Sequence, residues 1–190
     1  MPGERARRFL KSTFGTADIS TMGSTDTGML GRLAEGRVQT AAQLQRLDPF
    51  TFWTLPSEGA ADFVVVGATG AFLVAVVPAL GKADVHKGHL VVDGVSLDGG
   101  RRLRAEAKRL QLTLSRANVA VRVEPVLCLT HAIAGAPRSD RGVRVVQVRD
   151  LAKDMTDRPQ ALPHLRAQRA ARALGMKLDG DEQGIVVEGR

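Results

Sequence analysis

A single acidic residue, Asp62, stands near the start of the most apolar part of the chain, residues 61–77 (ADFVVVGATGAFLVAVV). Carboxylates are the ligands with which proteins hold Mg²⁺, usually one or two of them together with water. Two other acids are close enough in sequence to join Asp62: Glu58 in the preceding loop and Glu35 in an upstream helical segment. The alternative is that Asp62 is a solvent-facing acid that opens a strand.

Asp84, His86 and His89 are a second group that could bind a metal. Their spacing matches no strong zinc signature, and a zinc site needs three or four ligands brought together in space. The sequence ADVHKGH therefore favours a solvated hairpin. His131 follows an apolar strand and could lie at the mouth of a cleft, whereas His164 follows a proline and is expected on the surface of a helix.

The one cysteine, Cys128, lies in an apolar run and is expected to be packed in the core. A single cysteine excludes a disulfide framework within the chain. No apolar run has the length that a bilayer crossing requires. The first 15 residues carry positive charges without the apolar segment of a secretory signal. We therefore expect a cytoplasmic protein that makes no membrane contact; the oligomeric state is not indicated.

Positive charge is concentrated in residues 101–122, which carry seven Lys or Arg and one Glu. Arg102, Arg109 and Arg116 recur every seven residues and form one stripe on a helix, next to Arg101 and Lys108. Such a stripe is either a solvated helix face or a contact for phosphates or an acidic protein surface. Aromatic residues make up only 4% of the chain, which disfavours binding of single strands by base stacking. Further arginines surround the last predicted strand: Arg138, Arg141, Arg144 and Arg149.

A net charge of +7 and 44% hydrophobic residues in 190 are typical of one domain with a real core. We assign residues 1–28 to an N-terminal arm with a short helix over ERARRFLKS, residues 29–175 to the domain, and residues 176–190 to a tail in which GIVVEG could form an edge strand.

The hydrophobic pattern predicts the elements that must position these residues. Helices are predicted over residues 31–47, 96–118 and 158–174, the second capped by Asp98. Leu33, Val38 and Leu44 fall on the apolar face of the first helix, and Leu103, Ala107 and Leu114 form the buried stripe of the second. Strands are predicted over residues 50–55, 61–67, 71–77, 121–130 and 142–150, with a hairpin over residues 82–94. Three early strands in succession indicate an antiparallel meander, and the later alternation indicates parallel strands. The fold class is therefore α/β, a mixed sheet with helices on both faces.

Several of these segments together resemble the nuclease-related domain (NERD) family, which has the restriction-endonuclease-like fold. The helix LAEGRVQTAAQLQRL resembles the family's opening helix, and ADFVVVGATGAFLVAVV resembles its core hairpin. VRVEPVLCLT resembles the strand after the long helix, and the match runs from about residue 30 to residue 149.

The resemblance implies a magnesium site built from an Asp on the first hairpin strand and a Glu-x-Lys on the second. Asp62 fits the first position, but the Glu position falls on Ala75, the Lys position on Val77 and a helix Glu on Arg37. We therefore expect no catalytic residues, no bound metal and no other cofactor. The alternative is a working Mg²⁺-dependent DNA nuclease that uses displaced acids such as Glu35 or Glu58.

The function implied by this reading is a nuclease-related domain that has lost its activity and binds DNA or an acidic protein surface. The sequence also suggests a new role for Asp62. Arg37 falls within the apolar arc of its helix, and a buried guanidinium needs an acid. We expect Arg37 and Asp62 to form a buried or half-buried ion pair across the former metal site.

Overall fold

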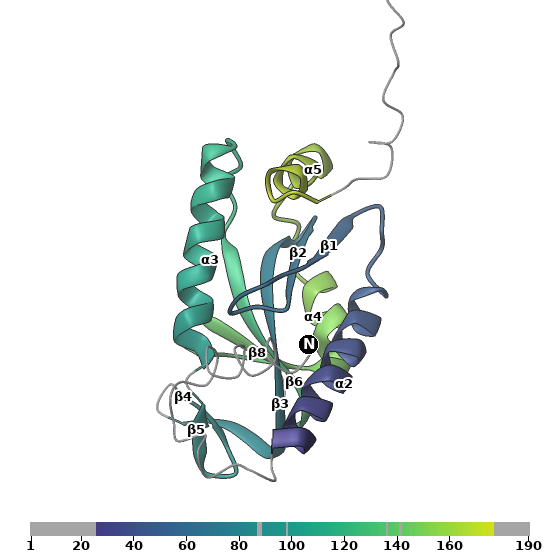
Figure 1. Ribbon diagram of the computed structural model, residues 1–190. Coiled ribbons are helices and arrows are strands. Elements are labelled where there is room, and N and C mark those ends of the chain that lie inside the picture. Colours follow the sequence, from purple (N-terminus) through teal and green to yellow (C-terminus); the bar gives the residue numbers. More distant parts are fainter. Residues whose placement is uncertain (1–25, 87–88, 98, 136, 141, 177–190) are drawn as a thin grey trace, which may run out of the picture.

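A computed structural model describes residues 26–86, 89–97, 99–135, 137–140 and 142–176. The predicted N-terminal helix, the Asp98 cap, Arg141 and the GIVVEG strand lie outside these residues. In the described part, the chain forms a mixed sheet covered by helices on both faces, so the α/β prediction is confirmed (Figure 1).

The sheet begins with an antiparallel meander and continues with parallel strands. Its order is β1-β2-β3-β6-β8-β7, and β3 pairs in parallel with β6, which pairs in parallel with β8. The strand bounds are β1 Phe52–Pro56, β2 Phe63–Gly67, β3 Gly70–His86, β4 His89–Val92, β5 Val95–Leu97, β6 Val123–Ile133, β7 Arg138–Asp140 and β8 Val143–Gln147. The far end of β3 pairs with β4 in the predicted hairpin, and β4 pairs with β5.

Helices form two layers on either side of this sheet. Their bounds are α2 Asp26–Leu44, α3 Gly99–Arg116, α4 Leu151–Thr156 and α5 His164–Ala173, and a short 3-10 helix, η2 Val148–Asp150, precedes α4. Residues of α3 and α5 share one apolar cluster with the sheet, and residues of α4 and the chain around the end of α2 share another. Figure 1 shows α3 on one side of the strands and α2 with α4 on the other.

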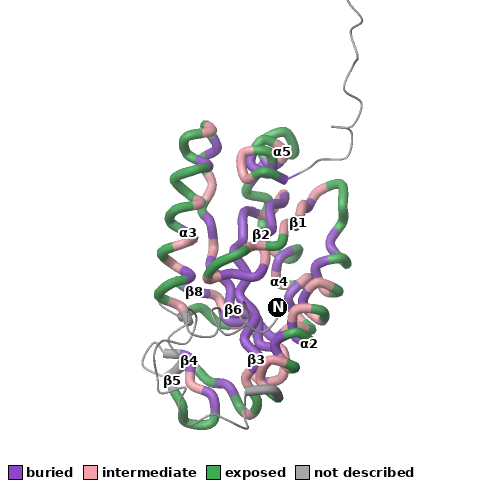
Figure 2. Tube along the Cα trace, viewed as in Figure 1, coloured by how far each residue is buried: buried purple, intermediate pink, exposed green. Residues whose placement is uncertain are grey.

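The central strands carry the core, because β2, β3 and β6 are covered on both faces. Residues 71–78 are buried without interruption, as a strand between two helical layers should be. In Figure 2 the buried trace follows these strands, while the helices alternate between buried and exposed positions.

The part of α2 that faces the sheet differs from the prediction. Val38, which was placed on the buried face, is 70% exposed, whereas Gly36 and Thr40 are buried. A Cβ atom built on Gly36 would lie 2.7 Å from Thr130 Oγ1, so the helix backbone approaches β6 closely. The prediction placed Val38 on the buried face because valine is hydrophobic. The close approach instead depends on small residues, above all on Gly36, which has no Cβ atom.

Candidate functional site

A local irregularity in the sheet determines where Asp62 points. The Asp62 backbone N–H donates to the Val74 carbonyl, although Val74 pairs in register with Phe63, the next residue. Asp62 and Phe63 therefore both lie opposite Val74, which is the arrangement of a β-bulge. A β-bulge changes the direction in which a side chain points. Asp62 is directed toward α2 instead of continuing the alternation of β2.

Both carboxylate oxygens of Asp62 accept a hydrogen bond. Arg37 Nε donates to Asp62 Oδ1 at 2.5 Å, and the Val76 backbone N–H donates to Oδ2 at 2.7 Å. The Asp62 side chain is 1% exposed and that of Arg37 is 42% exposed. The predicted ion pair is therefore present, buried on the acid side and half-buried on the arginine side.

Electrostatics at Asp62 reflect a balance between burial and its donors. Burial raises the pKa of Asp62, while the Val76 N–H and the positive charge of Arg37 lower it, and the net direction is upward. Arginine thus compensates only part of the cost of holding this carboxylate inside the protein.

The other two positions of the implied metal site lie elsewhere. Ala75 and Val77 are buried in the apolar cluster that contains Leu103 and Leu114 of α3. Val76, between them, packs instead against Leu33 of α2. The structure brings Arg37 and Asp62 together, but it places Ala75 and Val77 on the opposite face of the sheet.

The acids considered for an active nuclease are both exposed. Glu35 accepts a hydrogen bond from Gln39 at 2.9 Å and lies 4.0 Å from His131 Nε2, and Glu58 lies in the loop before β2. Among the described residues, no three His, Cys, Asp or Glu side chains gather as metal ligands would. Arg37 also sets a fixed positive charge against Asp62, so these residues do not fit a magnesium ion.

A buried thiol lies next to this ion pair. Cys128 Sγ is 3.6 Å from Thr40 Oγ1 of α2, and the cysteine is fully buried as expected. Burial, assisted by the nearby charge of Asp62, raises the pKa of Cys128 to about 12. This environment favours the protonated thiol.

The remaining polar candidates make local contacts. Asp84 pairs with Arg138 at 2.8 Å on the surface, and the side chains of His86 and His89 lie outside the described atoms. His131 Nε2 lies 3.2 Å from the Arg32 carbonyl oxygen, so this histidine packs against α2. His164 is exposed and its ring is 5.7 Å from that of Trp53.

The stripe on α3 is exposed as a set. The exposed cations are Arg101, Arg102, Lys108, Arg109 and Arg116. Glu106 is the one acid of this helix, and its carboxylate accepts a hydrogen bond from the Ala60 N–H at 2.8 Å. Because Glu106 turns toward the loop before β2, it does not interrupt the outer surface of α3.

Sequence reasoning missed a second row of cations on α5. Arg166, Arg169 and Arg172 recur every three residues and are exposed, while Ala167 and Ala170 are buried against the sheet. The signal was present in the sequence as arginines alternating with alanines at helical spacing. It becomes informative only when α5 is placed in the same layer as α3.

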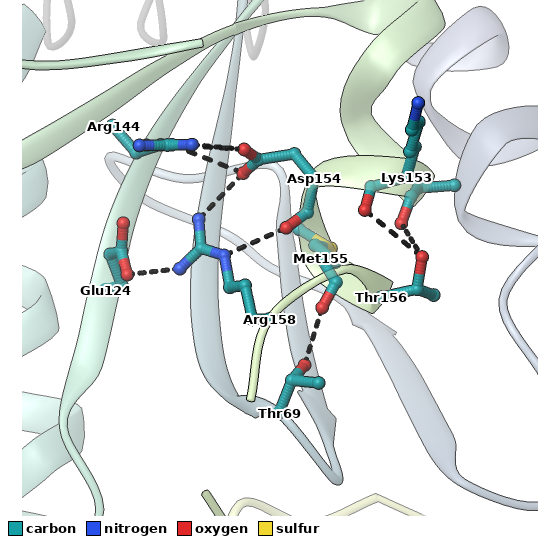
Figure 3. Close-up of polar contacts among 9 residues, drawn as sticks. Thr69, Glu124, Arg144, Lys153, Asp154, Met155, Thr156 and Arg158 are labelled. Atoms are coloured by element: carbon teal, nitrogen blue, oxygen red, sulfur yellow. Dashed lines mark hydrogen bonds and ion pairs between the residues drawn. The ribbon is translucent and has the colours of Figure 1, made fainter. Parts of the chain in front are cut away.

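Among the arginines around β8, Arg144 belongs to an ion-pair network with Asp154, Arg158 and Glu124 (Figure 3), whereas Arg149 pairs with Asp150 at the surface, as Arg138 does with Asp84. Arg144 Nη2 donates to Asp154 Oδ1 at 2.5 Å, and Arg158 donates to both Asp154 and Glu124. Burial alone raises the pKa of Asp154, but the hydrogen bonds and charges of the two arginines outweigh it and lower the pKa. This network ties α4 to β6 and β8, so the charges of Arg144 and Arg158 are paired within the protein.

Comparison with known proteins finds no matching family model, no matching curated protein and no matching solved structure. None of the helices in the described part of the chain has the length and apolar character needed to cross a membrane.

Proposed function

We propose that this chain is a nuclease-related domain that does not cleave nucleic acid and acts as a nucleic-acid-binding module. The observation that carries the proposal is the ion pair between Arg37 and Asp62. A catalytic Asp in such a domain would offer its oxygens to a metal ion, and here they accept hydrogen bonds from a guanidinium and a backbone N–H.

The order of elements supports the relation to nuclease-related domains. A helix, an antiparallel meander, a long helix and a parallel strand follow each other as the resemblance implies. Ala75 and Val77 support the absence of activity, because they lie on the opposite face of the sheet from Asp62 and neither side chain can bind a metal or position water.

The exposed cations of α3 support binding. Phosphates attract such clusters without regard to base sequence, and counterion release makes the affinity depend on salt. A cytoplasmic location is part of this proposal, in keeping with a chain that has one cysteine.

The test combines cleavage and binding. Full-length protein is incubated with supercoiled plasmid and Mg²⁺ or Mn²⁺, and we expect salt-sensitive binding without nicking. The triple variant Arg102→Ala, Arg109→Ala, Arg116→Ala should reduce the salt slope by about 2.7, at about 0.9 per phosphate contact. Nicking by highly purified protein that Asp62→Ala abolishes would show that the proposal is wrong.

A further inference from the structure

Charge is divided unequally between the two helical layers. α3 carries six Lys or Arg and one Glu, and α5 carries three Arg and no acid. Nine cations against one acid leave a surplus of eight, which exceeds the net charge of +7 for the whole chain. In the other layer, α2 has two Arg against two acids and α4 has one Lys against one Asp.

The two basic helices pack next to each other on the same face of the sheet. α3 and α5 contact each other, and residues of both belong to the same apolar cluster on one face of the sheet. Figure 1 shows α5 beside the end of α3 at which β6 begins. We define the α3/α5 face by the exposed cations Lys108, Arg109, Arg116, Arg166 and Arg169.

From this arrangement we infer that the α3/α5 face is a binding site for double-stranded nucleic acid, with α5 supplying contacts in addition to those of α3. The inference rests on the proposed function and names the ligand and the second helix. A duplex carries one negative charge per about 1.7 Å of its axis, so it offers phosphates along the part of α3 from Lys108 to Arg116, which spans roughly 12 Å at 1.5 Å per residue.

The chemistry of the face favours a duplex over a single strand. Proteins that bind single strands stack the bases on aromatic side chains. Neither α3 nor α5 contains Phe, Trp or Tyr. Rigid helices with cations at fixed spacing suit a ligand whose phosphates are also at fixed positions.

The position of the face also explains binding without cleavage. Asp62 points toward α2, on the other side of the sheet from α3 and α5. A duplex held by the α3/α5 face is therefore separated from Asp62 by the sheet itself.

The experiment measures binding of a fluorescent 20-base-pair duplex and of the same-length single strand by anisotropy, at several salt concentrations. The α5 variant Arg166→Gln with Arg169→Gln is compared with a control that loses the same charge from the other layer, Arg46→Gln with Lys153→Gln. Both control residues are exposed. Circular dichroism verifies that each variant is folded.

We expect the duplex to bind more tightly than the single strand. The α5 variant should lower the duplex salt slope by about 1.8, at about 0.9 per contact, and the control should leave it unchanged. The inference would be overturned, but not the proposed function, if the control lowered the duplex salt slope as much as the α5 variant does. The same holds if the α5 variant left that slope unchanged while the α3 triple variant still weakened binding. Tighter binding of the single strand would also overturn only the inference. Failure of the wild type to bind either nucleic acid, or equally tight binding of polyglutamate, would overturn both and favour an acidic protein partner.

Discussion

The Asp62 carboxylate keeps its place because Arg37 and the Val76 N–H both donate to it. A metal ion would neutralise a carboxylate at this position in a nuclease, and the fixed charge of arginine performs that part of its role here. The resemblance assigns Asp62 to a catalytic metal site, but here the residue has a structural function. A carboxylate whose side chain is 1% exposed would destabilise the fold if it had no partner.

Replacing Arg37 by leucine should destabilise the fold at neutral pH. The expected loss in the free energy of unfolding is about 3 kcal/mol, the lower end for breaking a buried pair, because the guanidinium is 42% exposed. Adding Asp62→Asn should recover much of that loss, since asparagine can still accept the Val76 N–H. Urea unfolding of the wild type, both single variants and the double variant measures the coupling.

The same variant should depend on pH in a defined direction. An acid whose pKa is higher in the folded than in the unfolded state stabilises the fold below its unfolded pKa, and that contribution disappears as pH rises through the folded pKa. The pKa of Asp62 is already raised, and loss of Arg37 raises it further. The deficit in the free energy of unfolding of Arg37→Leu, relative to the wild type, should therefore become smaller as the pH falls toward 3.8, the ordinary pKa of aspartate. An equal deficit at pH 7 and pH 4, or no coupling in the cycle, would show that the pair has no such role.

At the scale of elements, the contact between α2 and the sheet depends on Gly36. Its missing Cβ leaves room for Thr130 Oγ1 at 2.7 Å and Val76 Cγ1 at 3.0 Å. Gly36→Ala should cost roughly 1–3 kcal/mol through overpacking, and Thr130→Ala in the same chain should restore part of it. Gly31→Ala is the matched control, because nothing lies within 4 Å of a Cβ there. It should stabilise the helix by about 0.5–1 kcal/mol, and thermal unfolding of the three variants distinguishes the effects. A Gly36→Ala variant as stable as Gly31→Ala would contradict the close approach.

The elements differ in how well the sequence predicts them. The hairpin of β2 and β3 and the buried stripe of α3 follow from periodicity, and the structure has both. The short helix α4 was not predicted, because six residues with two buried side chains give too little periodic signal. The close approach of α2 to β6 at Gly36 was not predicted, because a hydrophobic pattern identifies large apolar side chains and gives no weight to glycine. The ion pair of Arg37 and Asp62 was predicted because a charge within an apolar arc requires a partner.

At the scale of the whole molecule, the sheet separates two surfaces with different chemistry. One layer holds the neutralised Asp62 under α2, and the other presents the cations of α3 and α5. The total charge can be counted from the sequence, but its unequal division between the two helical layers cannot. Along the chain, α3 and α5 are separated by three strands and by the segment that forms the Asp154 network. Only the packing of both helices on one face adds their charges together.

The most direct test of this account is a titration of the ¹⁵N-labelled full-length chain with a short duplex in the presence of Mg²⁺, followed by NMR. We predict that shift changes concentrate on the amides of α3 and α5, that those of Arg37, Asp62 and Val76 stay unchanged, and that the duplex remains intact. Shifts centred on Arg37, Asp62 and Val76, together with cleavage of the duplex, would contradict it.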